Sequence, residues 1–121
     1  MRATTAEIAQ KFNHLPGPVW FEGHWGFQYY MQKQGFTPLE VKKMQVAAGD
    51  LVILPWNNVN VYPLNPKFFT LVSRMTRPAC RWLAVMNNRV GAGFYLAKFG
   101  PLPFVFGSVP ADIYTIYQCT R

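Results

Sequence analysis

The stretch PVWFEGHWGFQYYMQKQ, residues 18–34, decides the fold of this chain. Its bulky apolar run at 19–21 is typical of a buried strand. Glu22, Gly23 and His24 then form a short polar turn, and the apolar residues after them recur at helical rather than alternating spacing. Open α/β sheets most often bind ligands where a strand ends and a helix begins, so the sequence predicts a site at this junction.

The segment 25–34 is expected to be a helix with two different faces. One face is apolar and is expected to pack on the sheet. It carries Phe27, Tyr30 and Met31. The opposite face carries Trp25, Tyr29 and Gln32. Gly35 is well placed to end the helix, because glycine readily adopts the left-handed conformation of a C-terminal cap.

The N-terminal residues predict a shorter helix that packs beside the first strand. Thr4 or Thr5, followed by Glu7, resembles a capping box, in which a hydroxyl and a carboxylate satisfy backbone N–H groups at the helix start. Ile8 and Phe12 lie four residues apart and give this helix one apolar face. The proline and glycine that follow end it.

Two further strands complete the parallel part of the sheet. The segment 36–39 is expected to be a short edge strand, because Pro38 cannot donate a backbone hydrogen bond to a neighbour. The segment 51–54 is apolar on both faces, so it is expected in the sheet centre beside the first strand. Polar residues at 56–58 follow it, and together with the turn at 22–24 they are expected to line one crevice.

The second half of the chain predicts antiparallel strands. Segments 68–75 and 81–86 are expected to form an antiparallel hairpin or a bent pair, and 113–117 alternates as a last strand. These patterns predict a mixed α+β (α/β) fold: a small open mixed sheet with a parallel βαβ first half, an antiparallel second half and two helices. The length of 121 residues predicts a single soluble domain at 1–121.

Twelve Lys and Arg residues against five Asp and Glu residues give the chain a net charge of +7. This excess fits a basic solvated surface, a face toward anionic membrane lipids, or a polyanion partner. The sequence has no helix-turn-helix, zinc-ligand or RNA-binding strand signature, which argues against nucleic acid. The basic residues that would make anionic-surface contacts are Lys42, Lys43, Arg74, Arg77 and Arg81, with Arg89 added for a nucleic-acid surface.

Cys80 and Cys119 lie far apart and have no neighbouring Cys or His, so their spacing fits neither a zinc site nor a redox motif. Their apolar surroundings favour two buried free thiols, while a disulfide would fit an oxidising compartment. His14 and His24 share no metal-ligand spacing, and we expect neither a metal nor a cofactor. No apolar run reaches the length of a membrane span, and the first residues lack the apolar core of a secretion signal.

Four segments of the chain resemble one known family. They are WFEGHWGFQYYMQKQG at 20–35, AGDLVILPWNN at 48–58, GAGFYLAKFGPLPFVFGSVP at 91–110 and IYTIYQC at 113–119. In this order they resemble the soluble C-terminal portion of bacterial integral-membrane glycosyltransferases. The family is glycosyltransferase family 39, the dolichyl-phosphate-mannose protein mannosyltransferase-like proteins.

The resemblance implies an extracytoplasmic domain at the periplasmic face of a bacterial inner membrane; without it, a cytoplasmic location would be expected. In that family a bundle of membrane helices carries the polyprenyl-phosphate-sugar site and the catalytic acid. The resemblance therefore transfers no catalytic residue to this chain. The implied partners are the membrane-embedded portion of the parent protein or a separate membrane subunit, together with a glycan or a polyprenyl-phosphate sugar.

Glu22 and His24 are close enough in sequence to act as an acid and a base. The alternatives are that both contact a ligand, or that Glu22 caps the helix while His24 packs against Trp25. Aromatic residues could instead form a sugar-stacking platform, although such residues more often pack in a core. The candidate ligand-binding residues are Glu22, His24, Trp25, Tyr29, Trp56 and Asn57.

The favoured function is a non-catalytic accessory or ligand-binding domain of a membrane glycosyltransferase-like protein, in contact with a glycan, a lipid-linked sugar or an anionic membrane surface. One alternative is a small free-standing enzyme that processes a glycan or phosphate ester through Glu22 and His24. Another is a binder of nucleic acid or other polyanions. We expect the chain alone not to be an enzyme, and we assign it no catalytic residue.

Overall fold

The computed structural model describes residues 2–40, 42–43, 45–58, 61–78, 83–84, 86–87, 91–93, 100–102, 104–107 and 111–121. The chain divides into two compact units. The larger unit comprises Met1–Met75 and Tyr114–Arg121, and the smaller unit comprises Thr76–Ile113. Within the described ranges, no helix is long and apolar enough to cross a membrane.

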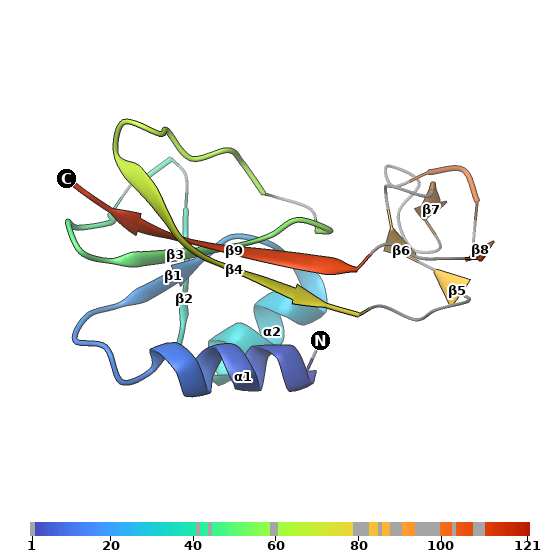
Figure 1. Cartoon of the computed structure of the whole chain (residues 1–121), viewed down its shortest axis with the longest axis horizontal. Coiled ribbons are helices and arrows are strands. Elements are labelled where there is room, and N and C mark those ends of the chain that lie inside the picture. Colours follow the sequence, from blue (N-terminus) through green and yellow to red (C-terminus); the bar gives the residue numbers. More distant parts are fainter. Residues whose placement is uncertain are drawn as a thin grey trace. The chain divides into compact units, whose positions relative to one another are not determined.

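The larger unit is built on a five-stranded sheet and two helices, which lie on the same side of the sheet (Figure 1). The helices are α1 (Arg2–Phe12) and α2 (Trp25–Lys33). The strands are β1 (Val19–Phe21), β2 (Thr37–Pro38), β3 (Leu51–Pro55), β4 (Phe69–Arg77) and β9 (Asp112–Cys119). Their order in the sheet is β2-β1-β3-β9-β4.

The strand pairing confirms the predicted mixed sheet. Strand β1 runs parallel to both β2 and β3, with Trp20 opposite Val52 in the β3 pair. Strand β3 runs antiparallel to β9, with Ile53 opposite Ile116. As predicted, β2 lies at an edge and β3 lies in the centre, where all five of its residues are buried.

The predicted hairpin between 68–75 and 81–86 is wrong. Strand β4 pairs with the last strand, β9, and the described residues of 81–86 pair within the smaller unit. There β5 (Leu83–Ala84) pairs with β8 (Val105–Phe106), and β6 (Met86–Asn87) pairs with β7 (Ala92–Gly93). The reason is that β9 is buried on both faces over 114–116 and so belongs beside β3, which leaves β4 as its outer neighbour.

The predicted capping box at the start of the first helix is also wrong. Helix α1 already begins at Arg2, so Thr4 and Thr5 lie inside it, and both are buried. The Thr5 hydroxyl donates to the Arg2 carbonyl oxygen at 3.0 Å, an alternative to capping that threonine commonly uses within helices. The predicted apolar contacts of Ile8 and Phe12 are confirmed, since both side chains are buried.

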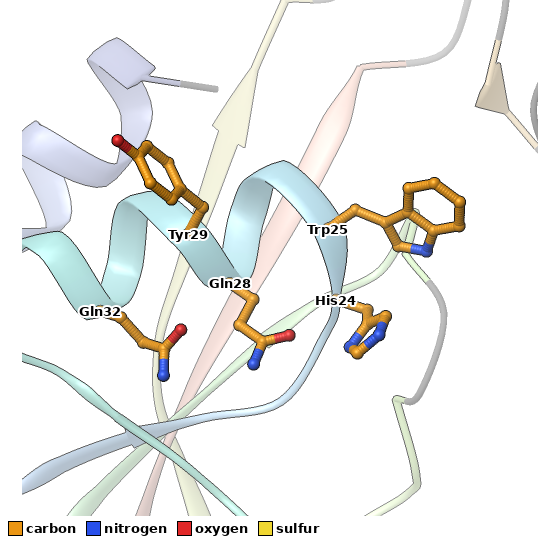
Figure 2. A pocket seen from close by; sticks show the side chains of 5 residues that line it. All are labelled: His24, Trp25, Gln28, Tyr29 and Gln32. Carbon is orange, nitrogen blue, oxygen red and sulfur yellow. The ribbon is translucent and has the colours of Figure 1, made fainter.

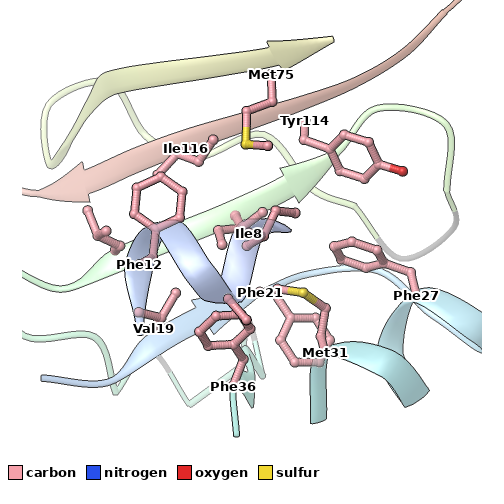
Figure 3. Packing of buried hydrophobic residues seen from close by; sticks show 13 residues of the cluster. Ile8, Phe12, Val19, Phe21, Phe27, Met31, Phe36, Met75, Tyr114 and Ile116 are labelled. Carbon is pink, nitrogen blue, oxygen red and sulfur yellow. The ribbon is translucent and has the colours of Figure 1, made fainter. Parts of the chain in front are cut away.

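The main core lies between the two helices and the sheet (Figure 3). It joins helix residues such as Ile8 and Met31 to strand residues such as Phe21 and Ile53, all fully buried. Each such side chain contributes about 1.5–3 kcal/mol by leaving water. The opposite face of β3 has its own smaller cluster, in which Val52 and its neighbours pack against residues of the connecting loops. Because both faces are covered, the sheet holds the carboxyl ends of β1 and β3 in fixed positions.

Helix α2 ends as the sequence predicts. Gly35 has a φ of +87°, the left-handed conformation that favours glycine. Its N–H donates to the Gln32 carbonyl oxygen, and the Phe36 N–H donates to that of Met31. These two bonds form a Schellman motif, and the buried side chains of Met31 and Phe36 supply the apolar pair that accompanies it. Because Met31 and Phe36 are buried at this end of α2, the opposite face of the helix is directed toward solvent.

Candidate functional site

The turn between β1 and α2 lies against the turn that follows β3. The His24 backbone N–H donates to Asn58 Oδ1 at 2.9 Å, which joins the two turns. Gly23 lies between them with a φ of +111°, and a Cβ there would lie 2.9 Å from Pro55 Cγ and 3.1 Å from Phe27 Cδ1. The polar turns at 22–24 and 56–58, which were predicted to line one crevice, are in contact here, and glycine is required at the point of contact. The pocket described next is lined by His24 but by no residue of 56–58.

The described pocket nearest this junction is a shallow open hollow on the exposed face of α2, with a volume of about 430 Å³. It is lined by His24, Trp25, Gln28, Tyr29 and Gln32. Figure 2 shows the three polar side chains, His24, Gln28 and Gln32, on one side of the helix. Tyr29 projects from the other side, and Trp25 extends beyond the first turn. The hollow therefore lies between a polar row and an aromatic row, each with a four-residue spacing.

Trp25 is held in an unfavourable conformation at the mouth of this hollow. Its φ is +62°, in the left-handed region that costs a residue other than glycine about 1–2 kcal/mol. Its side chain is also 54% exposed, so it gains little from burial. The indole makes an edge-to-face contact with the His24 ring, with centroids 6.5 Å apart. Backbone strain of this kind is concentrated at functional sites, because folding alone does not favour it.

Tyr29 continues the aromatic row one turn along the helix. It is 59% exposed, and its ring meets the edge of Tyr30 with centroids 5.1 Å apart. Lys33 Nζ lies 5.9 Å from the Tyr29 ring centroid, a cation–π distance. Contacts on two sides restrict the Tyr29 ring while leaving it accessible, which lowers the entropy that a ligand must remove on binding.

Glu22 lies in the interior and is not a residue of the hollow. It is 2% exposed, and its Oε2 accepts a hydrogen bond from the Tyr62 backbone N–H at 2.5 Å. Its Oε1 has no hydrogen-bond partner among the residues that the structure describes. Burial raises the pKa of Glu22 above its ordinary value of 4.5, and the Tyr62 N–H partly opposes this. His24 is exposed, so the two residues face different surroundings.

Glu22→Gln is expected to make the protein more stable than wild type at neutral pH. A pKa raised in the folded state means that ionisation opposes folding, so wild-type stability falls as pH rises from 4.5 through the folded-state pKa. The glutamine variant does not ionise, and its advantage in midpoint of thermal unfolding should therefore be small at pH 4 and grow toward pH 7. Thermal unfolding of both proteins across this range measures the difference. An advantage that shrinks with rising pH would contradict the assignment.

The other aromatic and polar candidates lie outside the hollow. Trp56 is exposed like Trp25, but its Nε1–H donates to the Thr115 hydroxyl at 3.2 Å. Asn57 is half-buried beside it. Neither residue lines the hollow. Gln28 and Gln32 line the hollow and were both absent from the predicted ligand-binding set, although their four-residue spacing from His24 is a signal that could have identified them.

The predicted basic residues that the structure describes lie in two separate places. Lys42 and Lys43 follow the edge strand β2, and Lys43 pairs with Glu40 at 2.8 Å. Arg74 and Arg77 belong to β4, the opposite edge of the sheet. Arg81, like Arg89, lies outside the described residues.

The structure describes one of the two cysteines. Cys119 has a buried free thiol, which donates to the Arg121 carbonyl oxygen at 2.8 Å. Cys80 lies outside the described residues, so the free or bridged state predicted for it stays untested.

In the part of the chain that the structure describes, no three His, Cys, Asp or Glu side chains gather as a metal site would require.

Compared with protein-family models, with curated proteins and with solved structures, the chain shows no match. The chemistry of the hollow is therefore the basis for assigning a function. Its five lining side chains offer two aromatic surfaces, two amides and an imidazole, and none is a carboxylate. Such a set can bind C–H surfaces and hydroxyl groups together.

Proposed function

We propose that this chain is a non-catalytic carbohydrate-binding domain and that the outward face of α2 is its binding site. The observation that carries this proposal is the pairing of exposed Trp25 and Tyr29, one helical turn apart, with a parallel row formed by an imidazole and two amides. Neither aromatic ring belongs to the core clusters. Core packing, the commoner role of aromatic residues, does not account for them.

The two rows match the two kinds of surface on a sugar ring. A pyranose has an apolar face of C–H groups and an edge of hydroxyl groups. Flat aromatic rings with a large apolar surface can cover the face of C–H groups. The amides of Gln28 and Gln32 each supply donors and an acceptor for the hydroxyl groups at the edge, and His24 adds a ring nitrogen. Because these groups are amides and an imidazole, with no carboxylate among them, the site suits hydroxyl-rich ligands.

The spacing of the aromatic row favours a chain of sugars over a single sugar. Four helical residues advance about 6 Å along the axis, about the length of one sugar unit, and the two side chains extend away from each other (Figure 2), so the aromatic row is longer than a single sugar. A shallow open hollow buries only part of any ligand, which predicts weak binding, with a Kd of about 10 μM to 1 mM. Longer oligosaccharides should therefore bind better than monosaccharides.

The resemblance to family 39 supplies the biological setting of the proposal. In this setting, the chain is an extracytoplasmic domain of a membrane glycosyltransferase-like protein and presents a glycan to the membrane-embedded part of that protein. An adjacent or fused reading frame with many spanning helices would support this setting. The alternative of catalysis through Glu22 and His24 has less support, because the carboxyl group of Glu22 is buried while His24 is exposed.

Trp25→Gly is expected to weaken oligosaccharide binding by about 30-fold, the typical loss when a central tryptophan is removed from a binding site. The same change removes the strain of the left-handed backbone, so the variant should be about 1 kcal/mol more stable than Trp25→Ala, which retains it. Binding is measured by NMR titration of the α2 amides with linear gluco-, manno- and galacto-oligosaccharides of increasing length. Thermal unfolding measures the second effect.

Trp56→Ala is the matched control, since it removes a tryptophan of equal exposure that lies outside the hollow. It should leave oligosaccharide affinity within twofold of wild type. The proposal fails if none of the oligosaccharides shifts the α2 amides, or if Trp56→Ala weakens binding as much as Trp25→Gly does.

A further inference from the structure

Lys33, the last residue of α2, adds a positive charge to the end of the aromatic row. It follows Trp25 and Tyr29 at the same four-residue spacing, which places all three side chains on neighbouring parts of one helix face. The Lys33 side chain is exposed, and its Nζ lies 5.9 Å from the centroid of the Tyr29 ring. An ammonium group therefore lies beside the second aromatic ring of the proposed site.

The residues that the structure describes do not neutralise the charge of Lys33. Lys33 forms an ion pair with none of them, whereas Lys43 pairs with Glu40 at 2.8 Å. Helix α2 contains no Asp or Glu, and none of the five side chains that line the hollow is a carboxylate. Glu22, which precedes α2, is buried and accepts a hydrogen bond from the backbone N–H of Tyr62. The Lys33 ammonium group is therefore available to an anionic group of a ligand.

The surroundings of Lys33 suit an anion that is attached to a sugar. The amides of Gln28 and Gln32 each carry an NH₂ group that can donate to a carboxylate or phosphate oxygen. A lysine ammonium group is a compact charge with three donors, so it can pair with either anion without requiring one orientation. Exposed lysines are common on protein surfaces, but this one contacts an exposed aromatic ring that lies outside the core clusters. A sugar that covers the Tyr29 ring can present an acidic substituent to Lys33.

We infer that the ligand of this face is an acidic oligosaccharide and that Lys33 selects it. The sugar rings stack on Trp25 and Tyr29, and a carboxylate or phosphate group on one of the sugars pairs with Lys33. The net charge of +7 acts in the same direction, because it attracts an anionic chain from a distance. This inference rests on the proposed carbohydrate site and adds the class of sugar that the site prefers.

The experiment compares neutral and acidic sugars of the same length and linkage. Gluco- and manno-oligosaccharides are titrated beside their uronate forms, in which C6 is oxidised to a carboxylate, and NMR titration of the α2 amides measures each affinity. The uronate form should bind about fivefold tighter at low salt, the upper range for one exposed ion pair, and this ratio should fall as salt concentration rises. A 6-phosphate form of the same sugars is the second acidic ligand. Whichever acidic form binds more tightly identifies the anionic group.

Three variants test whether Lys33 causes the preference. Lys33→Gln removes the charge and should lower the acidic-to-neutral affinity ratio to below about twofold. Lys33→Arg keeps the charge and should keep the ratio. Lys67→Gln is the matched control, because Lys67 is also exposed, lies shortly before β4 and forms no ion pair with a described residue. It should show the same ratio as wild type.

The outcomes separate this inference from the proposed function on which it rests. Equal affinity for neutral and acidic sugars would overturn the inference and leave the carbohydrate site intact. A ratio that Lys67→Gln lowers as much as Lys33→Gln does would also overturn it, since the preference would then come from overall charge. If no sugar, neutral or acidic, shifts the α2 amides, both proposals are overturned.

Discussion

Gly23→Ala is expected to destabilise the protein by about 3 kcal/mol, the sum of backbone strain and steric overlap. The φ of +111° is unfavourable for any residue with a Cβ, and this Cβ would lie 2.9 Å from Pro55 Cγ. The ring of a proline at the end of the buried strand β3 cannot move aside easily. The midpoint of thermal unfolding should therefore fall by roughly 10 °C.

Gly35→Ala separates the two contributions. Gly35 also has a positive φ, +87°, but a Cβ there would meet nothing within 4 Å. This variant should lose only about 1 kcal/mol, from strain alone. Equal destabilisation of the two variants would mean that the turn at Gly23 is not closely packed against β3. The outcome bears directly on the site, because Gly23 is the point where the turns below the hollow meet.

Phe27→Ala is expected to cost about 3–5 kcal/mol, the usual range for removing a fully buried phenylalanine. Phe27 has no exposed surface and joins α2 to the sheet. Its ring stacks on Tyr114 of β9 with centroids 5.7 Å apart and meets the edge of Phe21 of β1 at 5.8 Å. The cavity left by alanine would remove contacts to both strands, and urea unfolding monitored by far-UV circular dichroism measures the loss.

Phe106→Ala is the corresponding control on the surface. Phe106 is 67% exposed, and its ring meets that of Phe104 with centroids 5.2 Å apart, so its removal should cost only about 0.5–1.5 kcal/mol, the usual contribution of an aromatic pair. A loss below 1 kcal/mol for Phe27→Ala would contradict the packing of α2 on the sheet. Since α2 carries the proposed sugar site, Phe27→Ala should also weaken oligosaccharide binding, whereas Phe106→Ala should not.

Local patterns were sufficient to predict the first half of the fold. The apolar runs at 19–21 and 51–54 gave both the parallel pairing and the central place of β3, because a strand apolar on both faces has to be covered on both. Helical spacing likewise separated buried Phe27 and Met31 from exposed Trp25 and Tyr29. Each of these inferences needed only residues close together in the sequence.

Features that depend on distant segments could not be predicted in this way. The pairing of β4 with β9 joins strands separated by the whole smaller unit, and no short pattern encodes it. Buried Glu22 accepts its hydrogen bond from the backbone N–H of Tyr62, forty residues away. The separation of Lys42 from Arg74 depends on the order of strands across the sheet. The hollow was only partly predicted, because His24 and the aromatic row were recognised and both Gln28 and Gln32 were missed.

The path of the chain between β4 and β9 has a consequence for how this architecture can vary. The chain leaves the larger unit after one strand and re-enters it in the neighbouring strand, so the smaller unit is an insertion within a single hairpin. Strands β4 and β9, which flank the insertion, are already hydrogen-bonded to each other, so the inserted residues are not needed to hold them together. An insertion of this kind can be lengthened, shortened or exchanged without altering the register of the sheet, and the smaller unit can evolve separately from the larger unit that carries α2.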